Sequence, residues 1–444
     1  MMLEDQDCLK LFPIRSARGT VRLPGSKSIS NRALLLAALS EGTCRLQGVL
    51  RADDTGRMLD ALRTLGVEVL EDPGDPTSFA VTGCGGRFPV RNADIFLGNA
   101  GTAARPLTAA LALQGGSYRL DGVARMRERP LGDLLAALRM LGCTIRCTGR
   151  EGYFPIEVGE RVRGGGPEEC SVSGSVSSQF LTSLLMSAPV YSGEGGMRIR
   201  VEGELISRPY VAMTLKLMER FGVRVVEKDG AFSVPHGSYR LSSPFSVEGD
   251  ASGASYFLAL GALAGGPVRV TGAGLDSIQG DTAFARVIER MGARVKWGSD
   301  WIEASAPESG RLRGIEADCT AIPDAAMTLA AMALGAEGET VLTGIGSWRV
   351  KETDRIAAME AELAKFGARV ASGRDYLRII PPVTLQPARV RTYNDHRMAM
   401  SLSLAACCGV EVEVLDPGCV SKTFPDYFER LSGLVELDMP PEGR

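Results

Sequence analysis

Six runs of apolar residues recur along the chain, each long enough for about two or three helical turns. Each run follows a polar stretch, and successive runs begin roughly 70–75 residues apart. A helix that is apolar on every side is typical of a buried position, so the pattern predicts six buried helices. The runs cover residues 33–39, 106–113, 180–188, 254–264, 325–334 and 398–408.

A second recurring pattern closes five of the six units. An amphipathic stretch ends in an apolar residue and a glycine, and alternating apolar residues follow. This order is typical of a helix that ends at a left-handed glycine and continues into a β-strand. The glycines are Gly66, Gly142, Gly222, Gly292 and Gly367. Each unit therefore contains a buried helix, an outer helix and several strands, and the sixth lacks the glycine–strand ending.

The number of units predicts more than one domain. Six units around one core would exceed the usual size of a single domain, so three units per domain is the simplest division. The midpoint falls near residues 245–248, which do not resemble a Gly/Ser linker, and we expect a short hinge there. If the helices of each domain run parallel, their polar starts converge, and two such faces across the hinge form a cleft.

Composition narrows the class of protein. The chain has 444 residues, of which 45% are hydrophobic and 23% charged, and its net charge is −3. This fits a globular protein of at least two domains and gives no indication of binding to nucleic acid or to anionic membranes. The first residues lack the basic and apolar regions of a signal peptide, and no apolar run is long enough to span a membrane. We expect a cytoplasmic protein.

Cysteine and histidine give little support to a metal site. The ten cysteines are scattered without a C-x-x-C pair, which favours buried free thiols over a zinc site or a disulfide framework. Only two histidines occur, His236 and His396, so a His-rich metal centre is excluded.

The polar stretches before the apolar runs carry the candidate chemistry. The first contains Lys27 and Arg32 among serines, with Ser28 or Ser30 as the N-cap. Free N–H groups at a helix start combine with these cations into an anion site. In the second, small residues after Asn99 leave N–H groups open to a ligand, with Thr102 as the cap. The third is rich in hydroxyl groups, which suits a sugar-like or polyol ligand.

The later starts add acids and a histidine. Asp324 precedes the fifth run, where capping is favoured over a role as general base. At the sixth, His396 stands beside an acid and Arg397, which favours chemistry. Between these starts, Lys351 and Arg355 lie four residues apart and share one face if helical, with Glu352 turned aside.

Five of these stretches together closely resemble the EPSP synthase family of enolpyruvyl transferases, over about Gly19 to Phe428. They read Leu-Pro-Gly-Ser-Lys-Ser, Leu-Gly-Asn-Ala-Gly-Thr-Ala, Val-Ser-Ser-Gln-Phe-Leu, Arg-Val-Lys-Glu-Thr-Asp-Arg and Tyr-Asn-Asp-His-Arg-Met. The resemblance implies a two-domain inverse (inside-out) α/β fold, in which each domain has three pseudo-symmetric units. It places residues 25–247 in one domain, residues 1–24 and 248–444 in the other, and the active site in the cleft between them.

The implied reaction moves the enolpyruvyl (carboxyvinyl) group of phosphoenolpyruvate (PEP) to the 5-hydroxyl of shikimate 3-phosphate and releases phosphate. It proceeds by addition and elimination without a metal or other cofactor, on the shikimate pathway to chorismate and the aromatic amino acids. The residues implied for shikimate 3-phosphate are Lys27, Ser28, Arg32, Ser177, Ser178, Gln179, Ser207, Tyr210, Asp324, Ser347 and Lys351. Those implied for PEP are Lys27, Asn99, Gly101, Arg129, Gln179, Arg355, Arg397 and Lys422.

The resemblance also implies catalytic roles. Asp324 would accept the proton of the 5-hydroxyl, and Glu352 would exchange a proton with the methylene carbon of PEP. Charge stabilisation and proton transfer would fall to the basic residues Lys27, Lys351, His396 and Lys422. Ser347 departs from the family, whose members carry Asn there. Gly101 matches the glyphosate-sensitive form, so we expect inhibition by glyphosate. We expect a monomer whose partners are small molecules.

Three alternatives fit less well. The related UDP-N-acetylglucosamine enolpyruvyl transferases carry a loop cysteine five residues before an Arg-Pro pair, where this chain has Ala124, and Asn where it has Ser28. A P-loop kinase requires adjacent Gly and Lys, which the segment before Lys27 lacks. A non-catalytic anion-binding protein would not need Asp324 and Glu352 among cations.

Overall fold

The computed structural model describes residues 2–5, 7–162 and 168–438. The chain divides into two compact units, which we call the middle unit (Gly25–Glu248) and the terminal unit (Met1–Pro24 with Gly249–Arg444). The chain passes between them at Pro24–Gly25 and at Glu248–Gly249, one residue after the expected second boundary. Glu248 is tied to the middle unit because its carbonyl accepts the N–H of Ser26 at 2.8 Å.

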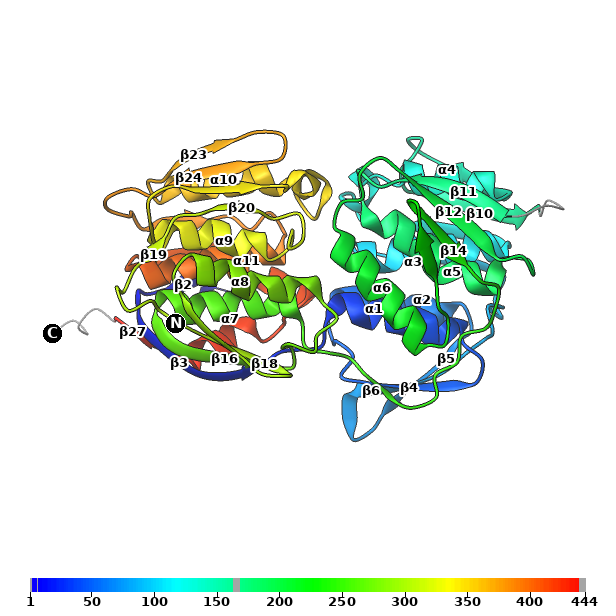
Figure 1. Ribbon diagram of the computed structural model, residues 1–444, viewed down its shortest axis with the longest axis horizontal. Coiled ribbons are helices and arrows are strands. Elements are labelled where there is room, and N and C mark those ends of the chain that lie inside the picture. Colours follow the sequence, from blue (N-terminus) through cyan, green and yellow to red (C-terminus); the bar gives the residue numbers. More distant parts are fainter. Residues whose placement is uncertain (1, 6, 163–167, 439–444) are drawn as a thin grey trace. The chain divides into compact units, whose positions relative to one another are not determined.

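Three buried helices form the centre of the described part of the middle unit (Figure 1). All residues of the first except Ser28 are buried, and helix α3 contacts both of the others. More amphipathic helices follow each of them and bury only one face, as their mixed sequences predict. The buried helices are α1 (Lys27–Leu39), α3 (Gly101–Gln114) and α5 (Ser178–Tyr191), and the outer ones are α2 (Asp53–Thr64), α4 (Gly132–Met140) and α6 (Arg208–Arg220).

Each buried helix of the middle unit lies against a four-stranded sheet of the same topology. In each, the first two strands pair in parallel and the rest are antiparallel. In sheet order, the strands are β15 (Phe245–Ser246), β4 (Thr43–Gln47), β6 (Asp75–Thr82) and β5 (Glu68–Asp72); β7 (Asn92–Phe96), β8 (Ser117–Asp121), β10 (Ile156–Arg161) and β9 (Cys143–Cys147); and β11 (Glu168–Ser173), β12 (Met197–Glu202), β14 (Ala231–Val234) and β13 (Val226–Lys228). Burial alternates along β4, so this sheet packs one face inward and exposes the other.

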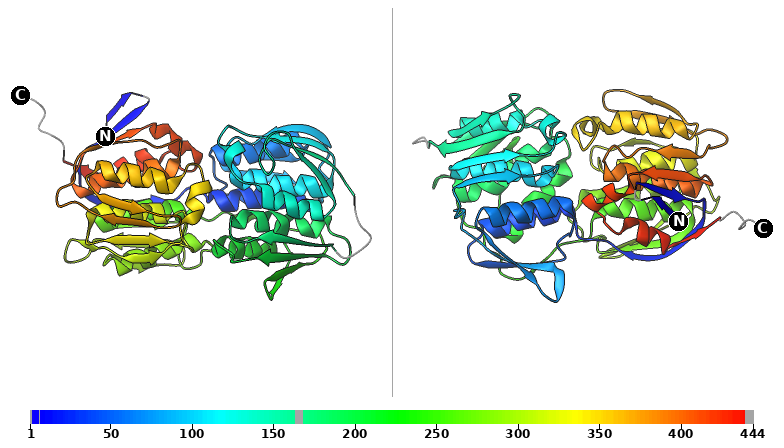
Figure 2. Two further views of the ribbon diagram at one scale, coloured as in Figure 1. Left: turned by 90° about the horizontal axis from the view of Figure 1, so that it is seen from above. Right: turned by 180° about the vertical axis from the view of Figure 1, so that it is seen from behind.

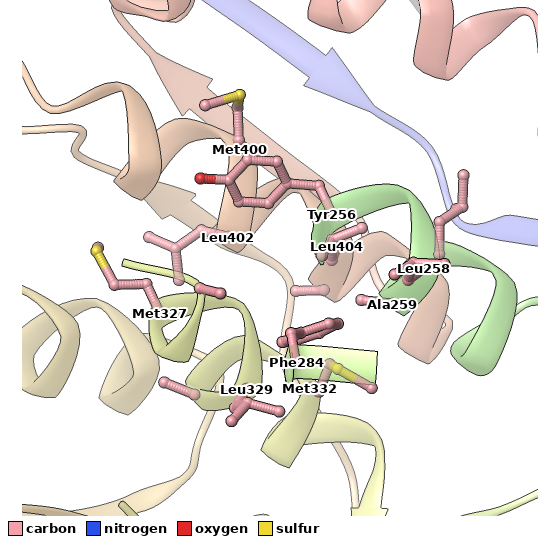
Figure 3. Packing of buried hydrophobic residues seen from close by; sticks show 14 of the residues in the cluster. Tyr256, Leu258, Ala259, Phe284, Met327, Leu329, Met332, Met400, Leu402 and Leu404 are labelled. Carbon is pink, nitrogen blue, oxygen red and sulfur yellow. The ribbon is translucent and has the colours of Figure 1, made fainter. Parts of the chain in front are cut away.

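The terminal unit repeats this plan. Its buried helices are α7 (Ala251–Leu263), α9 (Ala326–Met332) and α11 (His396–Ser403), with 3₁₀ turns η3 (Ala333–Gly335) and η5 (Leu404–Cys408) continuing the last two. Figure 3 shows Tyr256 and Leu258 of α7 near Leu402 and Leu404, all of which are at most 1% exposed. The outer helices are α8 (Phe284–Arg290), α10 (Arg355–Lys365) and α12 (Tyr427–Ser432), and further 3₁₀ turns are η2 (Gly280–Ala283), η4 (Gly346–Val350) and η6 (Pro417–Lys422).

The sheets of the terminal unit draw on both ends of the chain. Strand β3 pairs in parallel with β16, and the β1–β2 hairpin adds to β26 by antiparallel pairing (Figure 2). In sheet order, the strands are β17 (Arg294–Trp297), β18 (Trp301–Ser305), β16 (Gly265–Thr271), β3 (Ile14–Arg22) and β27 (Val435–Leu437); β20 (Glu316–Asp318), β22 (Thr340–Thr343), β24 (Leu377–Ile380) and β23 (Arg369–Ser372); β1 (Met2–Asp5), β2 (Cys8–Leu11), β26 (Val412–Leu415) and β25 (Ala388–Val390); and the short pair β19 (Leu312–Arg313) and β21 (Ala336–Glu337).

The inverse α/β fold predicted from the sequence is confirmed, with helices inside and sheets outside in both units. The five predicted C-terminal glycines all have positive φ, between 78° and 103°. In the third unit the strand starts at Val226, three residues later than expected. All ten cysteines fall within described residues and are free, although five are only half-buried. No helix in the described ranges is long and apolar enough to cross a membrane.

Candidate active site

The start of helix α1 differs from the sequence prediction in its capping residue. Ser26, rather than Ser28 or Ser30, is the N-cap, and its hydroxyl accepts the N–H of Ile29 at 3.5 Å. An N-cap needs non-helical backbone, which Ser26 has (φ −61°, ψ 122°). The helix therefore begins at Lys27, while the Ser30 hydroxyl accepts the N–H of Leu50 at 3.0 Å.

The first turns of the three buried helices of the middle unit meet. The Asn31 amide donates to the Thr102 hydroxyl at 2.7 Å and so joins α1 to α3. Arg105 donates to the Gln179 side-chain oxygen at 3.1 Å and so joins α3 to α5. The prediction of Thr102 as the cap of α3 is wrong, because Ala100 occupies the N-cap position without a side-chain bond. The convergence of helix starts predicted from the repeats holds in this unit.

Arg129 lies over the start of α3. Its Nη1 donates to the carbonyl and side-chain oxygens of Asn99, at 3.1 and 3.0 Å. A Cβ at residue 101 would lie 2.7 Å from Nη2 of Arg129. Gly101 thus allows the close approach of Arg129, a residue that is 96% buried, to the N-terminus of this helix.

Two further cations of the middle unit are buried. Nζ of Lys27 lies 3.4 Å from Oδ2 of Asp54, and both side chains are less than 10% exposed. Arg32 donates through Nε to the Thr214 hydroxyl at 2.8 Å. Burial lowers the pKa of Arg32 to about 10, against the opposing effect of Tyr210. Arg32 still remains charged at neutral pH and can bind an anion.

The predicted hydroxyl groups line the starts of α5 and α6. Ser177 is the N-cap of α5 and accepts the N–H of Gln179 at 3.2 Å, and Ser178 follows it as a buried residue. Ser207 precedes α6 with φ at 52°, and Tyr210 lies in the first turn. A non-glycine residue with positive φ is uncommon and marks a constrained backbone.

In the terminal unit, Asp324 binds three cations. Its Oδ1 lies 3.0 Å from Nη1 of Arg355 and 3.3 Å from Nζ of Lys351, and its Oδ2 lies 3.1 Å from Nη2 of Arg397. Burial favours the neutral acid, but the three cations hold the pKa of Asp324 well below its usual value. The favoured interpretation of Asp324 as a cap is wrong, because Ala325 is the N-cap of α9.

Arg355 is the centre of this cluster. It is 99% buried and donates to both carboxylate oxygens of Asp395, at 2.8 and 3.2 Å, and to Oε2 of Glu352 at 2.8 Å. Burial opposes the charge, yet these acids and Asp324 raise the pKa of Arg355 above its usual value. Lys351 precedes helix α10, which begins at Arg355, so the expected shared helical face is wrong. Nor does Glu352 turn aside.

The remaining predicted residues of the terminal unit differ in their contacts and burial. Arg397, in the first turn of α11, donates to the hydroxyl of Tyr256 at 3.2 Å, and burial raises the pKa of that tyrosine to about 12. His396 is fully buried, with Nδ1 3.5 Å from Oδ1 of Asp395. Ser347 lies in η4, and Lys422 ends η6 with 8% exposure.

Three residues of these clusters were not assigned from the sequence. Asp54 pairs with Lys27, Asp395 orients Arg355, and Arg105 lies beside Gly101. Arg105 carried a usable signal, since a cation inside a run of buried apolar residues is seldom accidental. Asp54 carried none, because acids are ordinary in the first turn of any helix.

Each unit thus holds a cluster with defined chemistry. Among its described residues, the middle unit has four buried cations in or beside the first turns of its buried helices, together with hydroxyl and amide groups. These are Lys27, Arg32, Arg105 and Arg129. The terminal unit combines cations and carboxylates, which suits both anion binding and proton transfer. How each predicted residue meets a substrate stays a prediction.

Comparisons with known proteins agree on one family. The family model described as EPSP synthase (3-phosphoshikimate 1-carboxyvinyltransferase) matches residues 12–431. Two curated proteins named 3-phosphoshikimate 1-carboxyvinyltransferase, from Nitrosomonas europaea and Thiobacillus denitrificans, are 56% and 59% identical over 96% of this chain and 98% and 99% of their own lengths. An EPSP synthase structure from Acinetobacter baumannii shares the fold, with a TM-score of 0.78 and 24% identity over 97% of this chain and 98% of that one.

Proposed function

The chain belongs to the EPSP synthase family, and from this premise we propose that it transfers the enolpyruvyl group of PEP to the 5-hydroxyl of shikimate 3-phosphate. The 5-hydroxyl adds to the double bond of PEP, and phosphate is then released by elimination. The observation that carries the proposal is the match to curated relatives at 56–59% identity over nearly the whole chain.

Binding of shikimate 3-phosphate falls mainly to the middle unit. Lys27 and Arg32 carry buried positive charge, and Ser28, Ser177 and Ser178 offer hydroxyl groups at helix starts. Charge-assisted hydrogen bonds from such groups hold a phosphate group strongly. The other residues proposed for this substrate are Gln179, Ser207, Tyr210, Asp324, Ser347 and Lys351.

PEP binding falls to the arginines of both units. Arg129, Arg355 and Arg397 are each at least 96% buried and present planar guanidinium groups, which match carboxylate and phosphate oxygens. Asn99, Gly101, Gln179, Lys27 and Lys422 complete the proposed set. The carboxylate and phosphate groups of PEP compete with Asp324 and Glu352 for the positive charge of Arg355. Binding of PEP therefore changes the electrostatic environment of both acids.

Asp324 is proposed as the base that accepts the proton of the 5-hydroxyl. With three cations attached it is a weak base, because its pKa lies well below the usual value. When PEP draws Arg355 and Arg397 to its own charges, that stabilisation decreases and the pKa of Asp324 rises toward the working pH. Glu352 exchanges a proton with the methylene carbon, and Lys27, Lys351, His396 and Lys422 stabilise charge or relay protons.

The proposal also covers inhibition by glyphosate and the place of the protein in the cell and in metabolism. Glyphosate, an anionic phosphonate, competes with PEP for the same cations. We propose a cytoplasmic monomer that acts in the shikimate pathway to chorismate and aromatic amino acids, with no metal or other cofactor. Small molecules are then its partners.

The test is to mix purified protein with shikimate 3-phosphate and PEP and to measure release of phosphate over time. We expect turnover, and we expect Glu352→Gln to reduce kcat by about 100-fold or more while both substrates still bind. Glu360→Gln is the matched control, since Glu360 lies on the same helix α10 and bonds only Ser372 among the described residues. It should keep normal turnover.

Other outcomes point to other functions. Turnover with UDP-N-acetylglucosamine in place of shikimate 3-phosphate would assign the chain to the related transferase activity. Binding of both ligands without phosphate release by the wild-type protein would indicate a non-catalytic anion-binding protein and would overturn the proposal.

A further inference from the structure

A strained turn leads into helix α11 and its site residues. Tyr393 and Asn394 have φ values of 54° and 53°, and the N–H of Asp395 closes the turn on the carbonyl of Thr392 at 2.9 Å. Turns with positive φ at both central positions are dominated by Gly, Asn and Asp. A tyrosine there is an outlier, which persists only where its surroundings enforce it.

Glu362 of helix α10 supplies that enforcement. Its side chain is completely buried, and its Oε1 accepts the Tyr393 hydroxyl at 2.7 Å. Its Oε2 accepts the N–H of Arg391 at 2.9 Å and Nζ of Lys365 at 2.6 Å. The carboxylate thus holds two groups of the segment that enters the turn, and Lys365 balances its charge.

The turn sets the position of the first residues of α11. Asp395 is the N-cap of this helix, accepts the N–H of Arg397 at 3.0 Å and holds Arg355 through both carboxylate oxygens. A shift of the turn would therefore move Asp395 and reorient two of the arginines of the cluster. The Tyr393 hydroxyl donates to Glu362, which lies outside the set of residues proposed for either substrate.

We propose that Glu362 and Tyr393 are positioning residues for PEP binding, because they hold the strained turn that sets Asp395 and, through it, Arg355 and Arg397. The proposal rests on the proposed function. Tyr393 opens the Tyr-Asn-Asp-His-Arg-Met motif but was given no role by the sequence, and Glu362 was not singled out. Neither is proposed to contact a reacting atom; they act through the backbone of the turn.

Tyr393→Phe is the variant of choice, since it removes one hydroxyl and keeps the ring. We expect the KM for PEP to rise about tenfold, which corresponds to about 1.4 kcal/mol of binding. The KM for shikimate 3-phosphate and kcat should stay within about twofold of wild type. In an Asp395→Asn background the same substitution should add little, because the two act along one chain of contacts.

Lys365→Met is the matched control. It removes another donor to the same carboxylate, but one that lies on helix α10 and outside the turn. Its KM for PEP should stay near that of wild type even where its thermal stability falls. Glu362→Gln, which keeps an oxygen acceptor for Tyr393 and Arg391, should have a smaller effect on KM than Glu362→Leu.

The outcomes separate this inference from the proposed function. Absence of turnover by the wild-type protein would overturn both. Turnover by wild type, with Tyr393→Phe unchanged in its KM for PEP, would overturn the positioning role alone. So would an equal rise in both KM values or an equal effect of Lys365→Met, since either would indicate general loss of structure.

Discussion

Gly101 brings the backbone of helix α3 into contact with two guanidinium groups. A Cβ at this position would lie 2.6 Å from Nη1 of Arg105 and 2.7 Å from Nη2 of Arg129. Both atoms end flexible side chains, so an added methyl group would displace the arginines and leave the backbone in place. The consequence belongs to ligand binding and much less to folding.

Gly101→Ala should raise the KM for PEP about tenfold or more, since a displacement near 1 Å is costly in a site that orients its ligand. The inhibition constant of glyphosate should rise as well, because the inhibitor competes for the same cations. Steady-state kinetics with varied PEP and glyphosate measure both. Gly56→Ala is the control, since a Cβ there meets no atom within 4 Å; unchanged inhibition of Gly101→Ala would contradict the assignment.

The lowered pKa of Asp324 predicts how the free energy of unfolding changes at acid pH. Because its pKa is lowered in the folded protein, its ionisation stabilises the fold above the unfolded pKa of about 3.9, and this stabilisation is lost as the pH falls toward the folded value. Asp324→Asn should therefore cost roughly 3 kcal/mol of unfolding free energy at pH 7, and this cost should fall by about 1 kcal/mol by pH 3 and further at lower pH. Denaturant unfolding of both proteins at each pH measures this, and a difference independent of pH would refute it.

At the scale of elements, the apolar runs predicted each buried helix correctly because burial on every side leaves a direct mark on the sequence. The five glycines were predicted for an equally local reason, since a helix that ends in left-handed backbone favours Gly. Both features depend on a few neighbouring residues and need no knowledge of the rest of the chain.

Helix caps and charged partners were predicted less well. Ser26, Ser28 and Ser30 are alike in type, and only the backbone angles at Ser26 decide which of them caps α1. The position of Asp324 in the sequence suits an N-cap, but Arg355 of α10 and Arg397 of α11 each form an ion pair with one of its two carboxylate oxygens. Partners that lie far along the chain cannot be derived from the local pattern, and for this reason the pairing of Asp395 with Arg355 was missed.

At the scale of the whole molecule, the exceptional sixth unit has a simple explanation. Its sheet has the same topology as the four-stranded sheets of the middle unit, but its last two strands, β2 and β1, come from the start of the chain. The chain does continue from α12 (Tyr427–Ser432) through Gly433 into β27, but Gly433 has a negative φ of −71° and β27 pairs with β3 in another sheet. The two strands that complete the sixth sheet therefore come from the start of the chain. The repeat pattern follows the order of the sequence, so it could not predict that strands from the start of the chain complete the last unit.

The pairing of β2 with β26 predicts that a substitution at Leu9 lowers the stability of the terminal unit, which contains Asp324. Leu9 of β2 is 99% buried and pairs with Val414, so Leu9→Ala should cost about 2–5 kcal/mol of unfolding free energy. All three tryptophans, Trp297, Trp301 and Trp348, lie in the terminal unit, and their fluorescence reports its unfolding in denaturant. Lys10→Ala changes the neighbouring residue, which is only half-buried and pairs with Glu411, and should cost no more than about 1 kcal/mol. If the tryptophan transition moved equally in the two variants, or in neither, the N-terminal hairpin would not belong to the cooperative core of that unit.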